Sequence, residues 1–265
     1  MNDNIVRETI PELKILSKVA LKDNWLKVTM GVFLYVLVSS VVPSILALFS
    51  PGVEVPVPAE NGELLNYQVP YINILYTVFI LGAISLGLAV FQLSFLRKRD
   101  INPSYIFSGF EFYFKATGLY LVELLFVTLW SFLFVIPGFI ALYKYSMAFY
   151  ILADDPQKGI MQCIRESKEM MKGNKAKLFL LELSFIGWFL LASIPASAYA
   201  SNFSINKAIG LGSADLNMTN PVVTIIFITL LMIPVYFVSS YTYTAKTIFY
   251  EIASGHLVAR QRQQR

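Results

Sequence analysis

The 265-residue sequence contains one cysteine, Cys163, and one histidine, His256, and its charged residues make up only 14% of the chain. A single cysteine excludes an internal disulfide and any cysteine-based metal cluster. A single histidine in a basic C-terminal stretch leaves little material for metal binding. The sequence also lacks a glycine-rich phosphate loop, a His-Glu-x-x-His zinc motif and a Gly-x-Ser-x-Gly nucleophile motif. We therefore expect neither an enzyme nor a bound cofactor.

Apolar residues, in contrast, are abundant and make up 56% of the chain. This share lies outside the range of soluble domains and predicts an integral membrane protein. The formal net charge of +4 could suggest a nucleic-acid partner. In a chain that crosses a membrane several times, however, excess Lys and Arg usually marks the cytosolic side, so we expect no nucleic acid.

Long apolar windows predict where the chain crosses the membrane, because a spanning helix needs about 20 mainly apolar residues. The sequence contains five windows of about this length and a sixth, from about Gly138 to Leu152, that is shorter. The predicted fold class is all-α, a bundle of about six transmembrane helices that forms a single polytopic domain over residues 1–265. The five longer windows run from about Val28 to Phe49, Tyr71 to Phe95, Ala116 to Ile136, Leu178 to Pro195 and Val222 to Ser240.

The sequence Ile136-Pro137-Gly138 separates the third window from the fourth. Proline cannot donate to the helical hydrogen-bond ladder and glycine loosens it, so we expect a helical hairpin that breaks at these residues. Six crossings then place both termini and every Lys and Arg except Lys144 and Lys207 on one side. The positive-inside bias makes that side, with both termini, the cytosol. A fourth segment that enters the membrane without spanning it is the alternative.

Two segments outside the spans have the pattern of amphipathic helices on the cytosolic surface. One is expected within residues 1–27, and the other from about 155 to 173 with Asp155 as its N-cap. Their basic faces predict contact with anionic lipid at the cytosolic face. The membrane bundle is expected over residues 28–245 and a basic cytosolic tail over 246–265. The sequence identifies no protein partner and leaves open whether the chain forms a homo-oligomer.

Three charged side chains lie within the predicted spans, namely Glu123, Lys144 and Glu182. A charge in hydrocarbon costs on the order of 3 kcal/mol and is usually kept for a partner or a pathway. All three fall in the cytosolic half, so we expect one buried polar cluster in which Lys144 pairs with one or both carboxylates. Two alternatives are a site for a proton, an ion or a lipid headgroup, and a Glu182 that reaches the interface beside Lys177.

Several motifs follow one another in a fixed order. "IPGFIALYKYSMAFYILADDP" is followed by "SKEMMKGNKAKLFLLELSFIGW", with weaker matches at "LKDNWLKV" and "IFYEI". In this order the sequence resembles the bacterial membrane-protein family called domain of unknown function 975. The resemblance implies a polytopic plasma-membrane protein without established activity or catalytic residues. Such proteins often carry a Lys soon after Ile-Pro-Gly, where this sequence has Ala141 and then Lys144.

Two hypotheses about function remain. The first is a non-catalytic protein of the bacterial plasma membrane that is associated with the envelope or with lipid, because surface helices are present and catalytic motifs are absent. The alternative is a small transporter or permease that uses the cluster of Glu123, Lys144 and Glu182.

Overall fold

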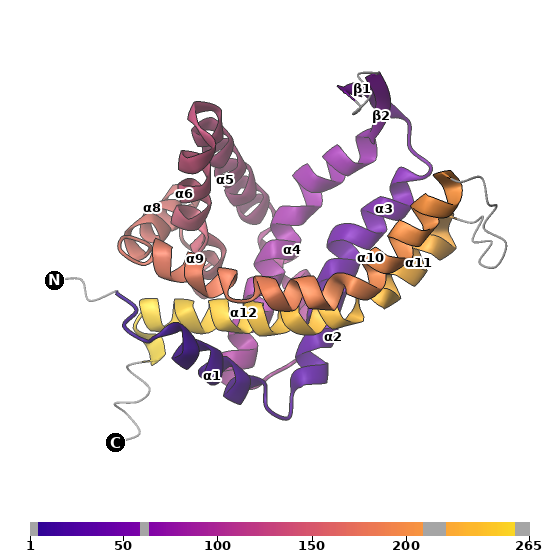
Figure 1. The fold of residues 1–265 in the computed structure, drawn as a ribbon. Helices are drawn as coiled ribbons and strands as arrows, with labels where there is room; N and C mark the ends of the chain where they lie inside the picture. Colours follow the sequence, from indigo (N-terminus) through magenta and orange to yellow (C-terminus); the bar gives the residue numbers. More distant parts are fainter. Residues whose placement is uncertain (1–4, 59–63, 209–220, 258–265) are drawn as a thin grey trace.

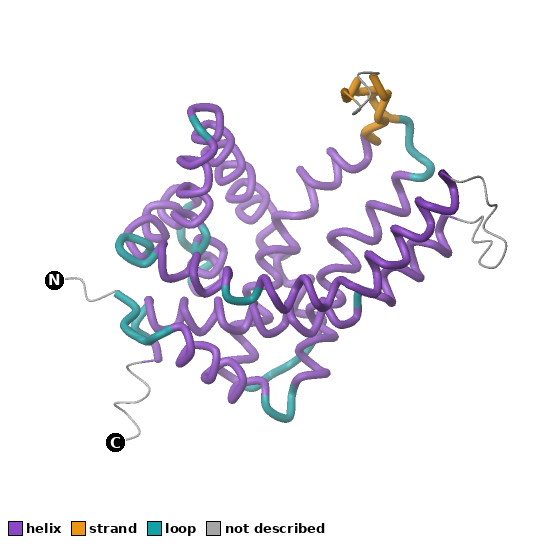
Figure 2. Tube along the Cα trace, viewed as in Figure 1, coloured by secondary structure: helices purple, strands orange, loops and turns teal. Residues whose placement is uncertain are grey.

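Helices make up nearly all of the secondary structure in the computed structural model, which describes residues 5–58, 64–208 and 221–257 (Figure 1). A two-stranded hairpin supplies the strands of the described parts (Figure 2). The prediction of an all-α membrane bundle is therefore confirmed.

Five helices of the described chain are long and apolar enough to cross a membrane, and a bent pair of helices makes six. The chain is thus a multi-pass membrane protein. The spans are α2 (Trp25–Val36), η1 (Leu37–Val41) and α3 (Val42–Ala47); α4 (Tyr71–Lys98); η2 (Pro103–Phe112) and α5 (Tyr113–Leu133); α6 (Val135–Tyr145) and α7 (Ala148–Asp154); α9 (Lys175–Leu183) and α10 (Ile186–Ala208); and the bent pair α11 (Pro221–Leu231) and α12 (Ile233–Ala253).

The first and last spans are both irregular at mid-length. In the first, η1 is a π-helical segment, and the Tyr76 hydroxyl of α4 donates a hydrogen bond to the Val38 carbonyl at 2.6 Å. A π turn inserts an extra residue and weakens the regular ladder, so its carbonyls accept from other donors. In the last, α11 and α12 meet at Met232 with a bend of 54°, and Pro234 occupies the first turn of α12.

The helical hairpin between the third and fourth spans breaks at a different residue from the one predicted. Phe134 has extended backbone angles, with φ −162° and ψ 153°, and separates α5 from α6. Pro137 and Gly138 lie in the first turn of α6, where proline is tolerated because the amide there lacks a helical partner anyway. A Cβ on Gly138 would lie 2.1 Å from the Ser131 Oγ, so this glycine allows α6 to pack closely on α5.

The fourth span is longer than its apolar window. α6 and α7 together form a candidate span of 20 residues, from Val135 to Asp154, which is long enough to cross the hydrocarbon core.

The surface helix α8 (Ile160–Met170) begins later than the predicted N-cap Asp155. The Asp155 carboxylate instead accepts a hydrogen bond from the Gln157 amide at 3.0 Å, which forms a local turn before the helix. Gly159 is the residue at the N-cap, and Gly173, with φ +88°, follows the helix.

The end of the bundle also lies further along the chain than predicted. The basic tail was expected from residue 246, but α12 continues to Ala253 and buries Phe249 and Tyr250 in its last two turns. The N-terminal helix α1 (Ile10–Leu21) packs along it, and the Tyr241 hydroxyl donates to the Lys14 carbonyl at 2.9 Å.

Helix α4 approaches η2 so closely that their backbones touch. A Cβ on Gly87 would lie 1.8 Å from the Ile106 carbonyl oxygen, and one on Gly109 would lie 1.9 Å from the Ala83 carbonyl oxygen. Glycine at both positions therefore allows the second and third spans to pack without an intervening side chain.

The strands β1 (Gly52–Pro58) and β2 (Leu64–Pro70) pair antiparallel, with Gly52 opposite Pro70. Figure 1 shows this hairpin at one end of the bundle, whereas α1, α8 and the C-terminal end of α12 lie at the other. At the hairpin's end, α10 continues through Pro195, where the predicted window stopped, to Ala208.

Candidate functional site

Glu182 is bound by two helices other than its own. The Tyr143 hydroxyl of α6 donates to the Glu182 Oε2 at 2.9 Å, and the Lys246 Nζ of α12 lies 3.4 Å from the Oε1. We call Glu123, Tyr143, Glu182 and Lys246 the polar cluster. The contacts of Glu182 within it join α6, α9 and α12, which belong to three different spans.

Lys177, the lysine beside which Glu182 could reach the interface, contacts a different part of the chain. The Lys177 Nζ donates to the Val6 carbonyl, so this lysine fixes the segment before α1 rather than the acid. The partners of Glu182 are instead Tyr143 and Lys246, and its position relative to the interface stays a prediction.

Glu123, on α5, belongs to the polar cluster through electrostatics rather than through a hydrogen bond. Its Oε1 is buried and has no hydrogen-bond partner among the described residues. The charge acting on it is the ammonium of Lys246. Lys246 thus pairs with Glu182 in the way that the sequence assigned to Lys144.

Lys144 lies outside the polar cluster, which corrects the predicted grouping with Glu123 and Glu182. Its Nζ lies 5.5 Å from the centre of the Trp130 ring and 5.1 Å from that of Tyr145. Neighbouring helical residues point about 100° apart, so Lys144 turns away once Tyr143 faces Glu182.

Lys144 lines an open cavity of about 690 Å³ between the α5–α6 hairpin and α8. Three further lysines line this cavity: Lys168 in the last turn of α8, Lys172 just after that helix, and Lys175 at the start of α9. We call this cavity the lysine pocket. Its remaining lining residues are Trp130, Pro137, Ile140, Ala141 and Glu169.

An ion network that was not predicted lies at the end of the bundle near α1. The Arg97 guanidinium pairs with Asp154 and also with Glu251, to which its Nε donates at 2.7 Å. Tyr250 donates to the same Asp154 carboxylate at 2.5 Å. This network links α4, α7 and α12. Its two acids lie in the stretches "LADDP" and "IFYEI". In the sequence, the feature that could have identified them is an acidic residue at the end of an apolar segment.

The polar cluster, the lysine pocket and most of the ion network fall in one continuous part of the chain. Residues 122–255 match the model of a protein family described as a protein of unknown function, DUF975. The match covers half of the chain. The chain belongs to this family. The resemblance predicted from its motifs is thereby confirmed.

Membership of DUF975 brings no established activity with it. The comparisons with curated proteins and with solved structures give no match to this chain. Nothing in the family match favours the transporter alternative. The described residues also contain no group of three or more His, Cys, Asp or Glu side chains that could hold a metal ion.

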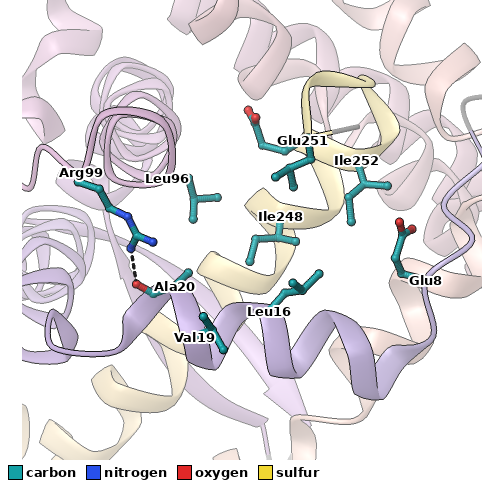
Figure 3. A pocket seen from close by; sticks show the side chains of 10 residues that line it. Glu8, Leu16, Val19, Ala20, Leu96, Arg99, Ile248, Glu251 and Ile252 are labelled. Atoms are coloured by element: carbon teal, nitrogen blue, oxygen red, sulfur yellow. Dashed lines mark hydrogen bonds between the residues drawn. The ribbon is translucent and has the colours of Figure 1, made fainter. Parts of the chain in front are cut away.

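A second cavity, of about 290 Å³, lies between α1, α12 and the end of α4 (Figure 3). Its walls are mainly apolar, with Glu8 and Glu251 on one side and Arg99 on the other. Arg99 donates to the Ala20 carbonyl at 2.6 Å, and Glu251 is already paired with Arg97. Arg99 thus joins the end of α4 to α1, and Glu251 joins α12 to α4.

Proposed function

We propose that this chain is a non-catalytic protein of the bacterial plasma membrane that associates with anionic lipid at its cytosolic end. It crosses the membrane six times and has both termini in the cytosol. The observation that carries the proposal is the unequal distribution of cations between the two ends of the bundle.

Basic residues gather at the end of the bundle that holds α1 and α8 (Figure 1). They lie in α1, at the C-terminal end of α4 from Arg97 to Arg99, and along α8 to the start of α9. The segment 51–70 at the opposite end contains no Lys or Arg. Since cytosolic segments carry an excess of Lys and Arg, this asymmetry supports a cytosolic location for α1, α8 and both termini.

The same cations support association with anionic lipid. Lys18 in α1, Lys22 just after it, and Lys168 and Lys172 at the end of α8 are exposed beside apolar spans. A cation close to an anionic leaflet contributes about 1 kcal/mol of attraction. The absence from the sequence of a phosphate loop, a zinc motif and a nucleophile motif supports a non-catalytic role.

Orientation is tested with reporters that are active on one side of the membrane only. A fluorescent protein fused at either terminus should fluoresce in the cytosol, and an alkaline phosphatase inserted at residues 59–63 should be active outside. The reversed pattern would overturn the proposed topology.

Lipid association is tested in nanodiscs of mixed phosphatidylglycerol and phosphatidylcholine. Native mass spectrometry should find phosphatidylglycerol enriched on the protein relative to the surrounding bilayer. A lipid shell with the bulk composition would overturn the association.

A further inference from the structure

We propose that the lysine pocket binds the headgroup of one anionic phospholipid, with an acyl chain lying against its apolar wall. The inference rests on the proposed function, because it requires α8 to lie at the level of the cytosolic leaflet. The inference goes beyond that function because it assigns lipid binding to one specific site at the cytosolic end.

The pocket has a large excess of positive charge. Four lysines and one glutamate line it, so its formal charge is +3. Within the described parts of the chain, none of the four ammonium groups forms an ion pair with a carboxylate. Lys158, just before α8, shows the contrast, since its Nζ pairs with Glu166 at 2.7 Å. Four cations around one cavity that holds a single acid, with which none of them pairs, are arranged to receive an anion.

Lys144 distinguishes this pocket from a group of solvated surface lysines. It is half-buried in the last turn of α6 and lies against the faces of two aromatic rings. Ring faces attract a cation only weakly, so they replace part of its hydration but do not neutralise it. A charge placed inside a membrane protein normally has a partner. The acids of the polar cluster are engaged elsewhere, by Lys246 and Tyr143.

The wall below the cations identifies the anion as a lipid rather than free phosphate. Trp130, Pro137, Ile140 and Ala141 form that wall on the α5–α6 hairpin. Trp130 and Ile140 are 43% and 49% exposed, so the pocket opens toward the side where the hairpin faces the bilayer. A volume of about 690 Å³ is within the range of small-molecule sites. The lysines would bind the phosphate of the headgroup, and the apolar wall would contact the first part of the acyl chain.

The test compares two double variants that remove the same charge at the same end of the protein. Lys168→Gln with Lys172→Gln alters the pocket, whereas Lys18→Gln with Lys22→Gln alters exposed cations on α1. Native mass spectrometry from nanodiscs containing phosphatidylglycerol measures how tightly the last anionic lipid is held. We expect the pocket variant to hold it about 30-fold more weakly and the α1 variant to match the wild type.

The expected rescue is Lys168→Arg with Lys172→Arg, which keeps both charges and should restore the lipid. Lys144→Met should also lose the lipid, yet unfold at the wild-type temperature in a detergent without anionic lipid, because it has no carboxylate partner to leave unpaired. Unfolding of Lys144→Met at a much lower temperature would mean that Lys144 stabilises the fold and would overturn its assignment to the site.

Two outcomes separate this inference from the proposed function. If both double variants lose anionic lipid equally, or neither does, the general association stands and the specific site is overturned. If the wild type shows no preference for phosphatidylglycerol, the proposed association itself fails. Displacement of the lipid by soluble glycerol phosphate at the same concentration would show that the apolar wall contributes nothing, and would overturn a lipid as the occupant.

Discussion

The Glu182 carboxylate on α9 lies 3.4 Å from the Lys246 ammonium on α12, across 64 residues of sequence that include α10 and α11. Their side chains are 30% and 24% exposed on the isolated protein, so the pair is only partly shielded. Together with the Tyr143 hydroxyl it joins three helices at one point.

Replacing Lys246 with Met removes the only cation of the polar cluster while keeping a side chain of similar length. Glu182 would then lack its partner cation, so we expect the free energy of unfolding to fall by about 1–3 kcal/mol. The measurement is the thermal unfolding midpoint in detergent micelles.

The matched control for this pair is the double variant Lys246→Met with Glu182→Gln. It removes the charge of both partners. Its loss of stability should be smaller than the sum of the losses measured for Lys246→Met and for Glu182→Gln alone, because the effects of coupled residues are not additive. A double variant whose loss equals the sum of the two single losses would mean that the pair is not coupled.

Gly87→Ala tests the close approach of α4 and η2. The added Cβ would meet the Ile106 carbonyl oxygen at 1.8 Å, and a backbone atom cannot move aside as a flexible side chain can. We expect a destabilisation of about 1–3 kcal/mol, seen as a lower unfolding midpoint. Gly187→Ala on α10 is the control, since its Cβ would meet nothing within 4 Å and alanine favours a helix. Equal effects of the two variants would contradict the packing.

The position of the hairpin break can be tested at Pro137 and Gly138. Because the break lies at Phe134, Pro137→Ala should cost only about 0.4–1 kcal/mol, mainly through a more flexible unfolded chain. Gly138→Val should cost more, since its side chain would collide with Ser131. Thermal unfolding compares the two variants. If Pro137→Ala were the more damaging, the break would depend on the proline after all.

Cys163 reports on the docking of α8, because it is the single cysteine of the sequence and is buried. Burial, and then the nearby Glu166 carboxylate, raise the pKa of its thiol to about 11. At pH 8 the reactive thiolate is therefore scarce. We expect maleimide to label the folded protein about 100-fold more slowly than the unfolded protein at pH 8, and faster as the pH rises toward 11.

A cysteine at the exposed position 165 of the same helix, introduced as Arg165→Cys in a Cys163→Ala background, should label quickly at pH 8. Rapid labelling of Cys163 itself in the folded protein would mean that α8 does not pack on the bundle.

The spans could be predicted because a long apolar window is a local signal. α4 begins at Tyr71, as its window does, after Pro70, which has extended backbone angles. Its C-terminal end lies at Lys98, where Arg99 takes the left-handed conformation with φ 56°. The last two residues of the helix, Arg97 and Lys98, are charged, so the apolar window ended earlier.

The polar cluster could be predicted only in part. Glu182 was found because an acid in an apolar helix is unusual, but Lys246 was missed because the window ended at Ser240 in a stretch rich in hydroxyl side chains. Those hydroxyls donate back to helical carbonyls, as Ser240 does to Tyr236 at 2.8 Å, so α12 continues through them. The partners of Arg97 could not be predicted, since they lie 57 and 154 residues away in the sequence.

The irregular segments of the first and last spans border one cavity of about 390 Å³, which has Ser40 and Val41 of η1 on one side and Met232 on the other. The outer parts of these two spans, α3 and α11, are in contact with each other. Both spans therefore depart from regular helix at the same level. In a bilayer of different thickness, we expect tilt to be absorbed at these two joints, while the polar cluster and the Arg97 network keep their geometry.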